Sequence, residues 1–260
     1  MAASGRSPTD SSNGCLAAVR RGLLAGVAGL MLVGTPPAPT DARPIAEPAA
    51  APAALAMVRV AATADFGTTL PGADARRLAD WVVRVGDHQG RPFFLVDKAH
   101  ATLYAFDRDA RLQASTPVLL GAAPGDDSVP GIGTRPMAQI LLAERTTPAG
   151  RFVAEAGRNL QGEDIVWVDH GAAISMHRVR TGNPRERRAQ RLATPTIDDN
   201  RISYGCINVP VAFYDRHVQA VFADRRSAIV YVLPQTRPLE AQAGLMREPA
   251  PVLARASRPH

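Results

Sequence analysis

Cysteine is nearly absent from this chain, whose 260 residues include only Cys15 and Cys206. Cys15 precedes an apolar run near the N-terminus, so removal of an export signal there would leave Cys206 alone in the mature chain. An unpaired cysteine outside the cytoplasm is a reactive thiol, an intermolecular bridge or a buried inert side chain. The count by itself leaves these three alternatives open.

Metal-binding patterns are also missing from the sequence. It contains no His-Glu-x-x-His motif, and the mature part has no pair of cysteines. These are the spacings that catalytic and structural zinc sites use most often. The sequence therefore predicts neither a metal site nor a cofactor.

Lysine is the third scarce residue type, because Lys98 is the only one and arginine supplies the rest of the basic charge. The net charge is +6 and the isoelectric point is about 10.1. A basic chain favours anionic partners such as nucleic acid, a membrane surface or a wall polymer. The arginines are scattered and no nucleic-acid-binding motif accompanies them, so we expect most of them to solvate loops and expect no nucleic-acid partner.

The N-terminal apolar run is short. Arg20 and Arg21 precede apolar residues 23–33, and a segment of small residues and prolines ends at Ala42. This order of basic, apolar and small residues is typical of a secretory signal, and the run falls short of the roughly 20 residues that span a bilayer. Residues 1–42 are predicted to be a signal peptide, with an uncleaved anchor as the alternative. Either way the remainder is exported, to the periplasm or the cell wall, with peripheral association to wall or membrane surface open.

Composition divides the rest of the chain. Residues 43–64 are rich in Ala and Pro and read as a linker, and residues 235–260 are similar and are predicted to be a disordered tail. Residues 65–91 form an N-terminal extension with a helix at 74–85, where apolar residues recur at helical spacing. The main folded domain is expected at 92–234.

That domain reads as mainly β. Short apolar or alternating runs separated by Gly, Pro and Asp indicate strands, whereas residues 180–200 are polar and arginine-rich and indicate a surface loop. A second helix is predicted at 210–223. The strands are expected at 93–96, 101–106, 111–120, 140–144, 151–156, 165–168, 172–176 and 227–233. The sum is a mainly-β domain with one or two packed helices.

Three motifs in this domain carry possible chemistry. Residues 202–208 read Ile-Ser-Tyr-Gly-Cys-Ile-Asn, so that Gly205 allows close approach to Cys206, and a helix starting just after it would lower the thiol pKa. Residues 173–177 form an apolar strand that ends in His177, a natural proton acceptor near neutral pH. Residues 147–152, Thr-Pro-Ala-Gly-Arg-Phe, read as a turn between strands. Each motif alone is weak evidence of a catalytic function.

In this order the three motifs resemble the L,D-transpeptidase catalytic domain, also called the YkuD-like domain. The family opens with a strand pair similar to residues 96–112, followed by a Thr-Pro-x-Gly-x-Phe turn, an apolar strand ending in His, and Ser-His-Gly-Cys with an apolar residue and Asn or Arg after it. The resemblance covers about residues 92–234, and its specific part is the Cys206 motif with the upstream His177. It implies a β-sandwich or barrel-like fold.

Two departures from the family pattern stand beside the nucleophile and the base. Tyr204 replaces the histidine of Ser-His-Gly-Cys, and Arg178 follows His177 where a glycine is common. His177 and Cys206 are 29 positions apart, which is longer than usual for the family, and the additional residues fall in the arginine-rich loop at 180–200. That loop either borders the substrate groove and attracts carboxylates or is a solvated insertion.

The resemblance implies a cysteine acyltransferase that acts on peptidoglycan stem tetrapeptides. Cys206 would be the nucleophile and His177 the base, with D-alanine released and an amine resolving the thioester. Backbone N–H groups of Gly205 and Cys206, with Tyr204, are candidates for the oxyanion site. Ser203 would shape the turn, Asn208 would tie the loop to its neighbours or touch substrate, and Arg178 is a further substrate-binding candidate. The alternatives are an L,D-carboxypeptidase with the same pair and a non-catalytic wall-binding protein on the same fold.

Overall fold

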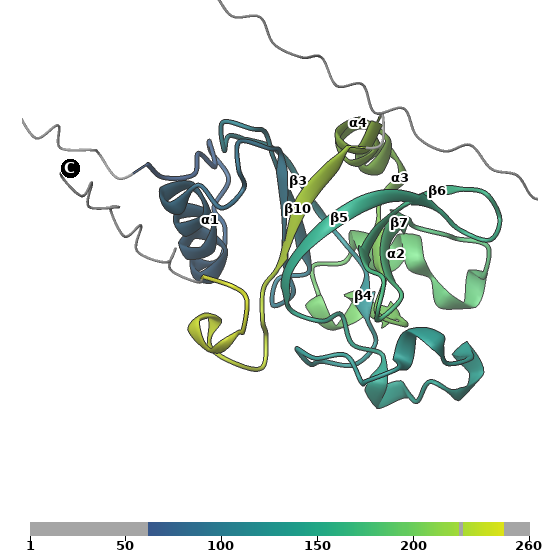
Figure 1. Cartoon of the computed structure of the whole chain (residues 1–260). Coiled ribbons are helices and arrows are strands. Elements are labelled where there is room, and N and C mark those ends of the chain that lie inside the picture. Colours follow the sequence, from purple (N-terminus) through teal and green to yellow (C-terminus); the bar gives the residue numbers. More distant parts are fainter. Residues whose placement is uncertain (1–61, 224–225, 247–260) are drawn as a thin grey trace, which may run out of the picture. The chain divides into compact units, whose positions relative to one another are not determined.

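The computed structural model describes residues 62–223 and 226–246, and its main feature is an eight-stranded sheet (Figure 1). The strand order is β3-β2-β1-β10-β5-β6-β7-β9, with parallel pairing between β1 and β10 and between β7 and β9. The strands of this sheet are β1 (Phe93–Asp97), β2 (Thr102–Phe106), β3 (Leu112–Pro117), β5 (Gly150–Arg158), β6 (Asp164–Asp169), β7 (Ile174–Arg178), β9 (Ile207–Val209) and β10 (Ser227–Val232). The mainly-β class predicted from the sequence is confirmed.

The sheet curls until it is nearly closed. Beyond β3, Leu119 exchanges both backbone hydrogen bonds with Asn208 of the edge strand β9, at 3.0 and 2.8 Å. A short parallel pair, β4 (Leu120–Gly121) and β8 (Arg201–Ser203), continues this seam. The two ends of the sheet are thus joined, and the result is barrel-like.

Strands β1 and β10 are buried on both faces because their side chains alternate between two hydrophobic clusters. Phe94 and Val96 point into the barrel interior with residues of β5, β6, β7 and β9. Phe93 and Leu95 point to the other face, where they pack with α1 (Ala73–Val85). Side chains of successive strand residues lie on opposite faces, so an unbroken apolar run is what such a strand requires.

Helix α1 covers the outer face of this part of the sheet (Figure 1). Leu78, Trp81 and Val82 follow helical spacing and are all buried. The helix ends at Gly86, whose φ of 69° and N–H bonds to the carbonyls of Val82 and Val83 form a left-handed cap. The helix expected at 74–85 is therefore present with nearly the predicted bounds.

Several predicted elements differ from the structure. The expected strand at 140–144 consists of 3-10 turns at Met137–Gln139 and Leu142–Glu144, because the Glu144 carboxylate accepts the Leu141 N–H at 2.9 Å. That bond satisfies a donor that a partner strand would have taken. The 180–200 loop includes a short helix, α2 (Arg188–Ala193), and 3-10 turns at Pro184–Glu186 and Ile197–Asn200. The helix at 210–223 is present as α3 (Val211–Phe213), a π-helical stretch (Tyr214–Val218) and α4 (Gln219–Phe222).

The segment after β10 also differs from the expected disordered tail. It contains a 3-10 turn at Leu239–Ala241, and Leu239 and Leu245 are buried in the cluster beneath α1. Gln242 donates from Nε2 to the Ala149 carbonyl at 3.0 Å. Leucines spaced six apart reach this cluster even though the surrounding residues are polar. The last residues, 247–260, lie outside the described part.

The N-terminal predictions fall mostly outside the described residues. The signal peptide at 1–42 and nearly all of the linker at 43–64 belong to residues 1–61. The end of the linker is described, and there Ala64 is buried and donates its N–H to Asp80 at 2.9 Å. In residues 62–223 and 226–246, no helix has the length and apolar character to cross a membrane.

Candidate active site

The predicted base lies on β7, and the predicted nucleophile immediately precedes β9, the parallel strand beside β7. Register pairs Met176 of β7 with Ile207 of β9, so Cys206, one residue before β9, lies beside Ser175. Ser175 and His177 are two residues apart on β7 and therefore share a face of the sheet. The Ser175 hydroxyl lies 3.5 Å from the Cys206 sulfur, and His177 and Cys206 line the same cavity.

The backbone orients the His177 ring. Its Nδ1 lies 2.7 Å from the Arg178 carbonyl oxygen, and because a carbonyl only accepts, Nδ1 must carry the hydrogen. The other ring nitrogen, Nε2, is left as the proton acceptor that a general base requires. This is the arrangement in which a third group fixes the tautomer of the base.

The thiol pKa is lowered by these neighbours. Burial alone would raise the pKa of Cys206, but hydrogen bonding and charge at His177, and hydrogen bonding from Ser175, shift it below the ordinary value of a thiol. The expected helix N-terminus does not contribute, because β9 follows Cys206 directly and α3 begins only at Val211. Ile207 and Val209 are β-branched, and Pro210 disfavours helical geometry at the residue before it, which explains the strand.

The pH dependence of alkylation tests this electrostatic arrangement. In a Cys15→Ser chain, where Cys206 is the only thiol, the midpoint of the rise in iodoacetamide rate with pH is expected to lie below the usual thiol pKa of about 8.5. In His177→Ala the midpoint of this pH profile is expected to move to higher pH, because burial raises the thiol pKa and the opposing effect of His177 is lost. An unchanged midpoint in His177→Ala would show that this histidine does not set the thiol pKa.

Neighbouring residues leave no room for a side chain at Gly205. Its φ is +127°, and a Cβ built on it would lie 2.6 Å from the Thr146 carbonyl oxygen and 2.6 Å from Ile174 Cδ1. The turn itself is closed by Ser203, whose hydroxyl accepts the Gly205 N–H at 3.0 Å and donates to the Cys206 carbonyl at 2.6 Å. The Gly205 N–H is thus occupied, contrary to the expectation that it would be free for an oxyanion.

Two cavities meet at Cys206. The larger, about 300 Å³, is bordered by His177, and the arginine-rich segment supplies one wall through Arg180 and Arg188. The smaller, about 180 Å³, is mainly apolar and is lined by Ile132, Ile140 and Ile174 among others. Tyr204 borders both, and the Arg145 guanidinium lies 3.8 Å above its ring. A group bound at the thiol therefore has charged side chains in the wall of one cavity and isoleucine side chains in the wall of the other.

Of two further candidate residues, Asn208 contacts the nucleophile loop, whereas Arg178 lies outside both cavities at Cys206. Asn208 is fully buried on β9, donates to the Cys206 carbonyl at 3.2 Å, and accepts from Arg188, so it ties the arginine-rich segment to the nucleophile loop. Arg178 is ion-paired with Asp164 at 2.8 Å and Asp215 at 2.6 Å. It lines a separate cavity of about 290 Å³ with His177, and the structure does not bring it to either cavity at Cys206.

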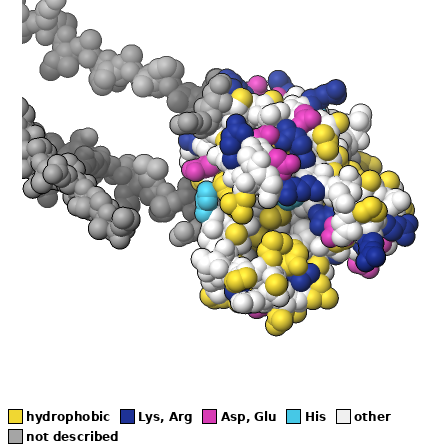
Figure 2. All heavy atoms as spheres, turned by 90° about the vertical axis from the view of Figure 1, so that its right-hand side faces the viewer, with side chains coloured by type: hydrophobic (Ala, Val, Ile, Leu, Met, Phe, Trp, Pro, Cys, Tyr) yellow, Lys and Arg dark blue, Asp and Glu magenta, His cyan; other side chains and the backbone are white. Residues whose placement is uncertain are grey.

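Most arginines around the site are paired with acids. Arg180 pairs with Glu163, Arg188 with Glu186, and Arg135 with Glu144. Figure 2 shows arginine and acidic side chains intermixed over the upper part of one face and hydrophobic side chains gathered over its lower part. Exposed apolar residues of the described chain include Met137, which borders both cavities at Cys206. The face is therefore mixed in charge rather than uniformly basic.

Sequence reasoning missed three contributors to the site. Ser175 had a signal, because it lies two residues before His177 in a predicted strand and shares its face. Arg145 and Met137 had none, since both belong to a segment of 3-10 turns whose position over Tyr204 and Cys206 depends on tertiary packing. Among the described residues no cluster of three or more potential metal ligands occurs.

No family model matches the chain, and no curated protein matches it in sequence. Similar solved structures include the K307A mutant of the helical cell shape determining protein Pgp2 from Campylobacter jejuni, at 15% identity and a TM-score of 0.36, covering 65% of this chain and 58% of that one. An L,D-transpeptidase from Mycobacterium smegmatis matches at 13% identity and a TM-score of 0.32, over 55% and 58% of the two chains. The catalytic domain of an Enterococcus faecium L,D-transpeptidase matches at 15% identity and a TM-score of 0.29, over 56% and 99%. The chain thus spans less than two thirds of Pgp2. These likenesses are too low to assign an activity, which must rest on the site itself.

Proposed function

We propose that this chain is an exported L,D-transpeptidase, a cysteine acyltransferase acting on the stem tetrapeptides of peptidoglycan. The observation that carries the proposal is the pairing of Cys206 with a tautomer-fixed His177 on neighbouring strands, at the junction of two cavities. The substrate class comes from the sequence motifs around this pair. The larger cavity supports it, because its lining includes Arg180 and Arg188 together with Glu186, a mixed-charge wall suited to the carboxylate and ammonium groups of a stem peptide.

The first half-reaction forms a thioester. His177 Nε2 takes the thiol proton, and the Cys206 thiolate attacks the carbonyl carbon of the residue before the terminal D-alanine. The Cys206 N–H is the backbone donor proposed for the resulting oxyanion, with the Tyr204 hydroxyl as a second donor. The C–N bond then breaks, and His177 returns the proton to the amine of the departing D-alanine.

The second half-reaction resolves the thioester. An amine of a neighbouring stem attacks the same carbonyl carbon and gives its proton to His177, and the thiolate leaves as a new amide forms. Water in place of the amine gives a free carboxylate, which is the carboxypeptidase alternative. A non-catalytic wall-binding protein remains the alternative of another class, and it requires an unreactive Cys206.

Mass spectrometry of the intact protein tests the proposal directly. The full chain is incubated separately with a disaccharide-tetrapeptide and with a carbapenem, and Cys206→Ala is the matched control. We expect a covalent adduct that is absent in the control, together with free D-alanine from the tetrapeptide. An added acceptor D-amino acid then separates transfer from hydrolysis. A folded protein with a free thiol and no adduct from either ligand would contradict the proposal.

Tyr204→Phe tests how far the tyrosine hydroxyl contributes. The ring keeps its place beneath Arg145, and only the hydrogen-bond donor is lost. We expect kcat for D-alanine release to fall by about tenfold or less, below the hundredfold or more that removal of an essential oxyanion donor costs. An inactive Tyr204→Phe enzyme with an unchanged thiol alkylation rate would instead make this hydroxyl essential to the chemical step.

A further inference from the structure

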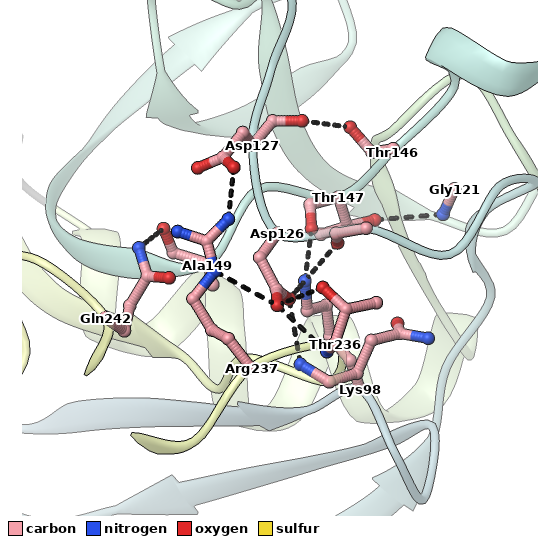
Figure 3. Close-up of polar contacts among 12 residues, drawn as sticks. Lys98, Gly121, Asp126, Asp127, Thr146, Thr147, Ala149, Thr236, Arg237 and Gln242 are labelled. Atoms are coloured by element: carbon pink, nitrogen blue, oxygen red, sulfur yellow. Dashed lines mark hydrogen bonds and ion pairs between the residues drawn. The ribbon is translucent and has the colours of Figure 1, made fainter. Parts of the chain in front are cut away.

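The only lysine of the chain forms a buried ion pair at the end of β1 (Figure 3). Lys98 Nζ lies 2.7 Å from Asp126 Oδ1, and both side chains are fully buried. The ammonium also donates to the carbonyls of Gly125 at 2.6 Å and Thr147 at 2.8 Å. All three of its hydrogens therefore have partners. Neither Lys98 nor Asp126 borders the two cavities at Cys206.

Asp126 connects this pair to the segment after β10. Its carboxylate accepts the Gln235 N–H at 2.8 Å, and the N–H and hydroxyl of Thr236 at 2.9 and 2.6 Å. Burial by itself would raise the pKa of Asp126, but hydrogen bonds from Lys98 and Thr236 hold it well below its ordinary range. Burial lowers the pKa of Lys98 to about 8 against the opposing effect of Asp126, so the pair is charged near neutral pH.

A buried ion pair is a weak source of stability, because desolvation offsets most of the attraction and apolar residues of similar volume often do as well. The pair instead fixes the relative positions of the chain segments that bind to it. Four segments meet at it: the end of β1, the loop at 125–126, the turn at Thr147 and the segment at 235–236. Figure 3 shows Thr147 and Thr236 on either side of the contact between Lys98 and Asp126.

The turn at Thr147 connects the pair to the nucleophile loop. Thr147 is buried, and its hydroxyl donates to the Gly205 carbonyl at 2.8 Å and accepts the Gly121 N–H at 2.9 Å. The neighbouring Thr146 donates from its hydroxyl to the Asp127 carbonyl at 2.7 Å. Lys98 therefore fixes one side of Thr147, and the other side of Thr147 fixes the residue before Cys206.

We propose that Lys98 and Asp126 are positioning residues for the nucleophile: by holding the Thr147 carbonyl, the pair sets where the Thr147 hydroxyl holds Gly205, and so how the Cys206 thiol faces His177. The inference rests on the proposed function in taking Cys206 as the nucleophile. It makes Thr147 the connecting residue, since its carbonyl contacts Lys98 and its hydroxyl contacts Gly205.

Thiol alkylation in the full-length Cys15→Ser chain tests this positioning role without any wall substrate. For Lys98→Met and for Thr147→Val we expect the iodoacetamide rate of Cys206 at neutral pH to fall about tenfold, with its pH midpoint shifted upward, because small displacements of a reacting pair are costly. Thr147→Ser keeps the hydroxyl and is expected to restore the wild-type rate and midpoint. Leu78→Ala is the matched control, since Leu78 is fully buried on the inner face of α1 and belongs to a hydrophobic cluster that includes none of Lys98, Asp126 and Thr147.

Leu78→Ala is expected to lower the Tm while leaving alkylation unchanged. The inference is overturned if folded Lys98→Met or folded Thr147→Val reacts at the wild-type rate and midpoint, or if Leu78→Ala slows alkylation as much as Lys98→Met does. Should Lys98→Met fail to fold, Asp126→Asn, which removes the carboxylate charge and keeps the side-chain volume, replaces it as the test of the pair, with the same expected loss and the same overturning outcome. If alkylation is slowed in the variants but the unsubstituted chain releases no D-alanine, the proposed function is rejected and this inference stands. If the unsubstituted chain releases D-alanine but alkylation is unaltered in the variants, this inference is rejected and the proposed function stands.

Discussion

Cys206→Ala is expected to abolish D-alanine release and cross-linking while leaving the fold intact. The sulfur is the only group at this position that can form the thioester, and alanine leaves the turn bonds made by Ser203 unchanged because they use backbone atoms of residues 205 and 206. We expect kcat to fall by about 10⁴-fold or more, as for other nucleophile deletions. Urea unfolding should show a stability change within about 1 kcal/mol, since no large side chain is lost.

His177→Ala is expected to cost nearly as much. Nucleophile and base act as a unit, so the double variant should be little worse than either single one. His170→Ala is the matched control, because His170 is an exposed histidine near the end of the neighbouring strand β6 and has no contact with Cys206. Additive losses in the double variant would indicate that the two residues do not form one catalytic pair, and full activity of Cys206→Ala would end the proposal.

The elements that sequence predicted well are those in which local pattern and burial agree. Strand β1 is a continuous apolar run because one set of its side chains enters the barrel and the other meets α1. The strand before His177 and its position at the site follow from the same alternation. In each case the period of the side chains is enough to place them, and no distant contact is needed.

The predictions that failed depended on contacts between distant parts of the chain. The helix expected right after Cys206 is replaced by β9, whose bonds to β7 and Leu119 no local pattern reveals. The Gly205 N–H appeared free in the sequence, and only the position of the Ser203 hydroxyl shows that it is used. Lys98 and Asp126 are 28 positions apart, and their pairing could not be inferred from spacing.

Gly205→Ala is the second substitution with a large expected effect. The new methyl group would lie 2.6 Å from the Thr146 carbonyl oxygen, a backbone atom, and its φ of +127° is one that alanine rarely adopts. Backbone strain and overpacking each cost about 1–3 kcal/mol, so we expect the free energy of unfolding to fall by about 2–6 kcal/mol. Urea denaturation with an unchanged m value would measure this loss.

The same substitution is expected to lower kcat by about a hundredfold, because relief of the clash must move Gly205 away from Thr146 and carry Cys206 with it. Gly162→Ala separates this steric effect from backbone strain. Gly162 also has a positive φ, of 80°, but nothing lies within 4 Å of its Cβ position. It should therefore lose a smaller part of its stability and keep full activity. If Gly205→Ala retained wild-type turnover, the close contact with Thr146 would not control the position of the thiol, and the path from Lys98 through Thr147 to Cys206 would lose its last step.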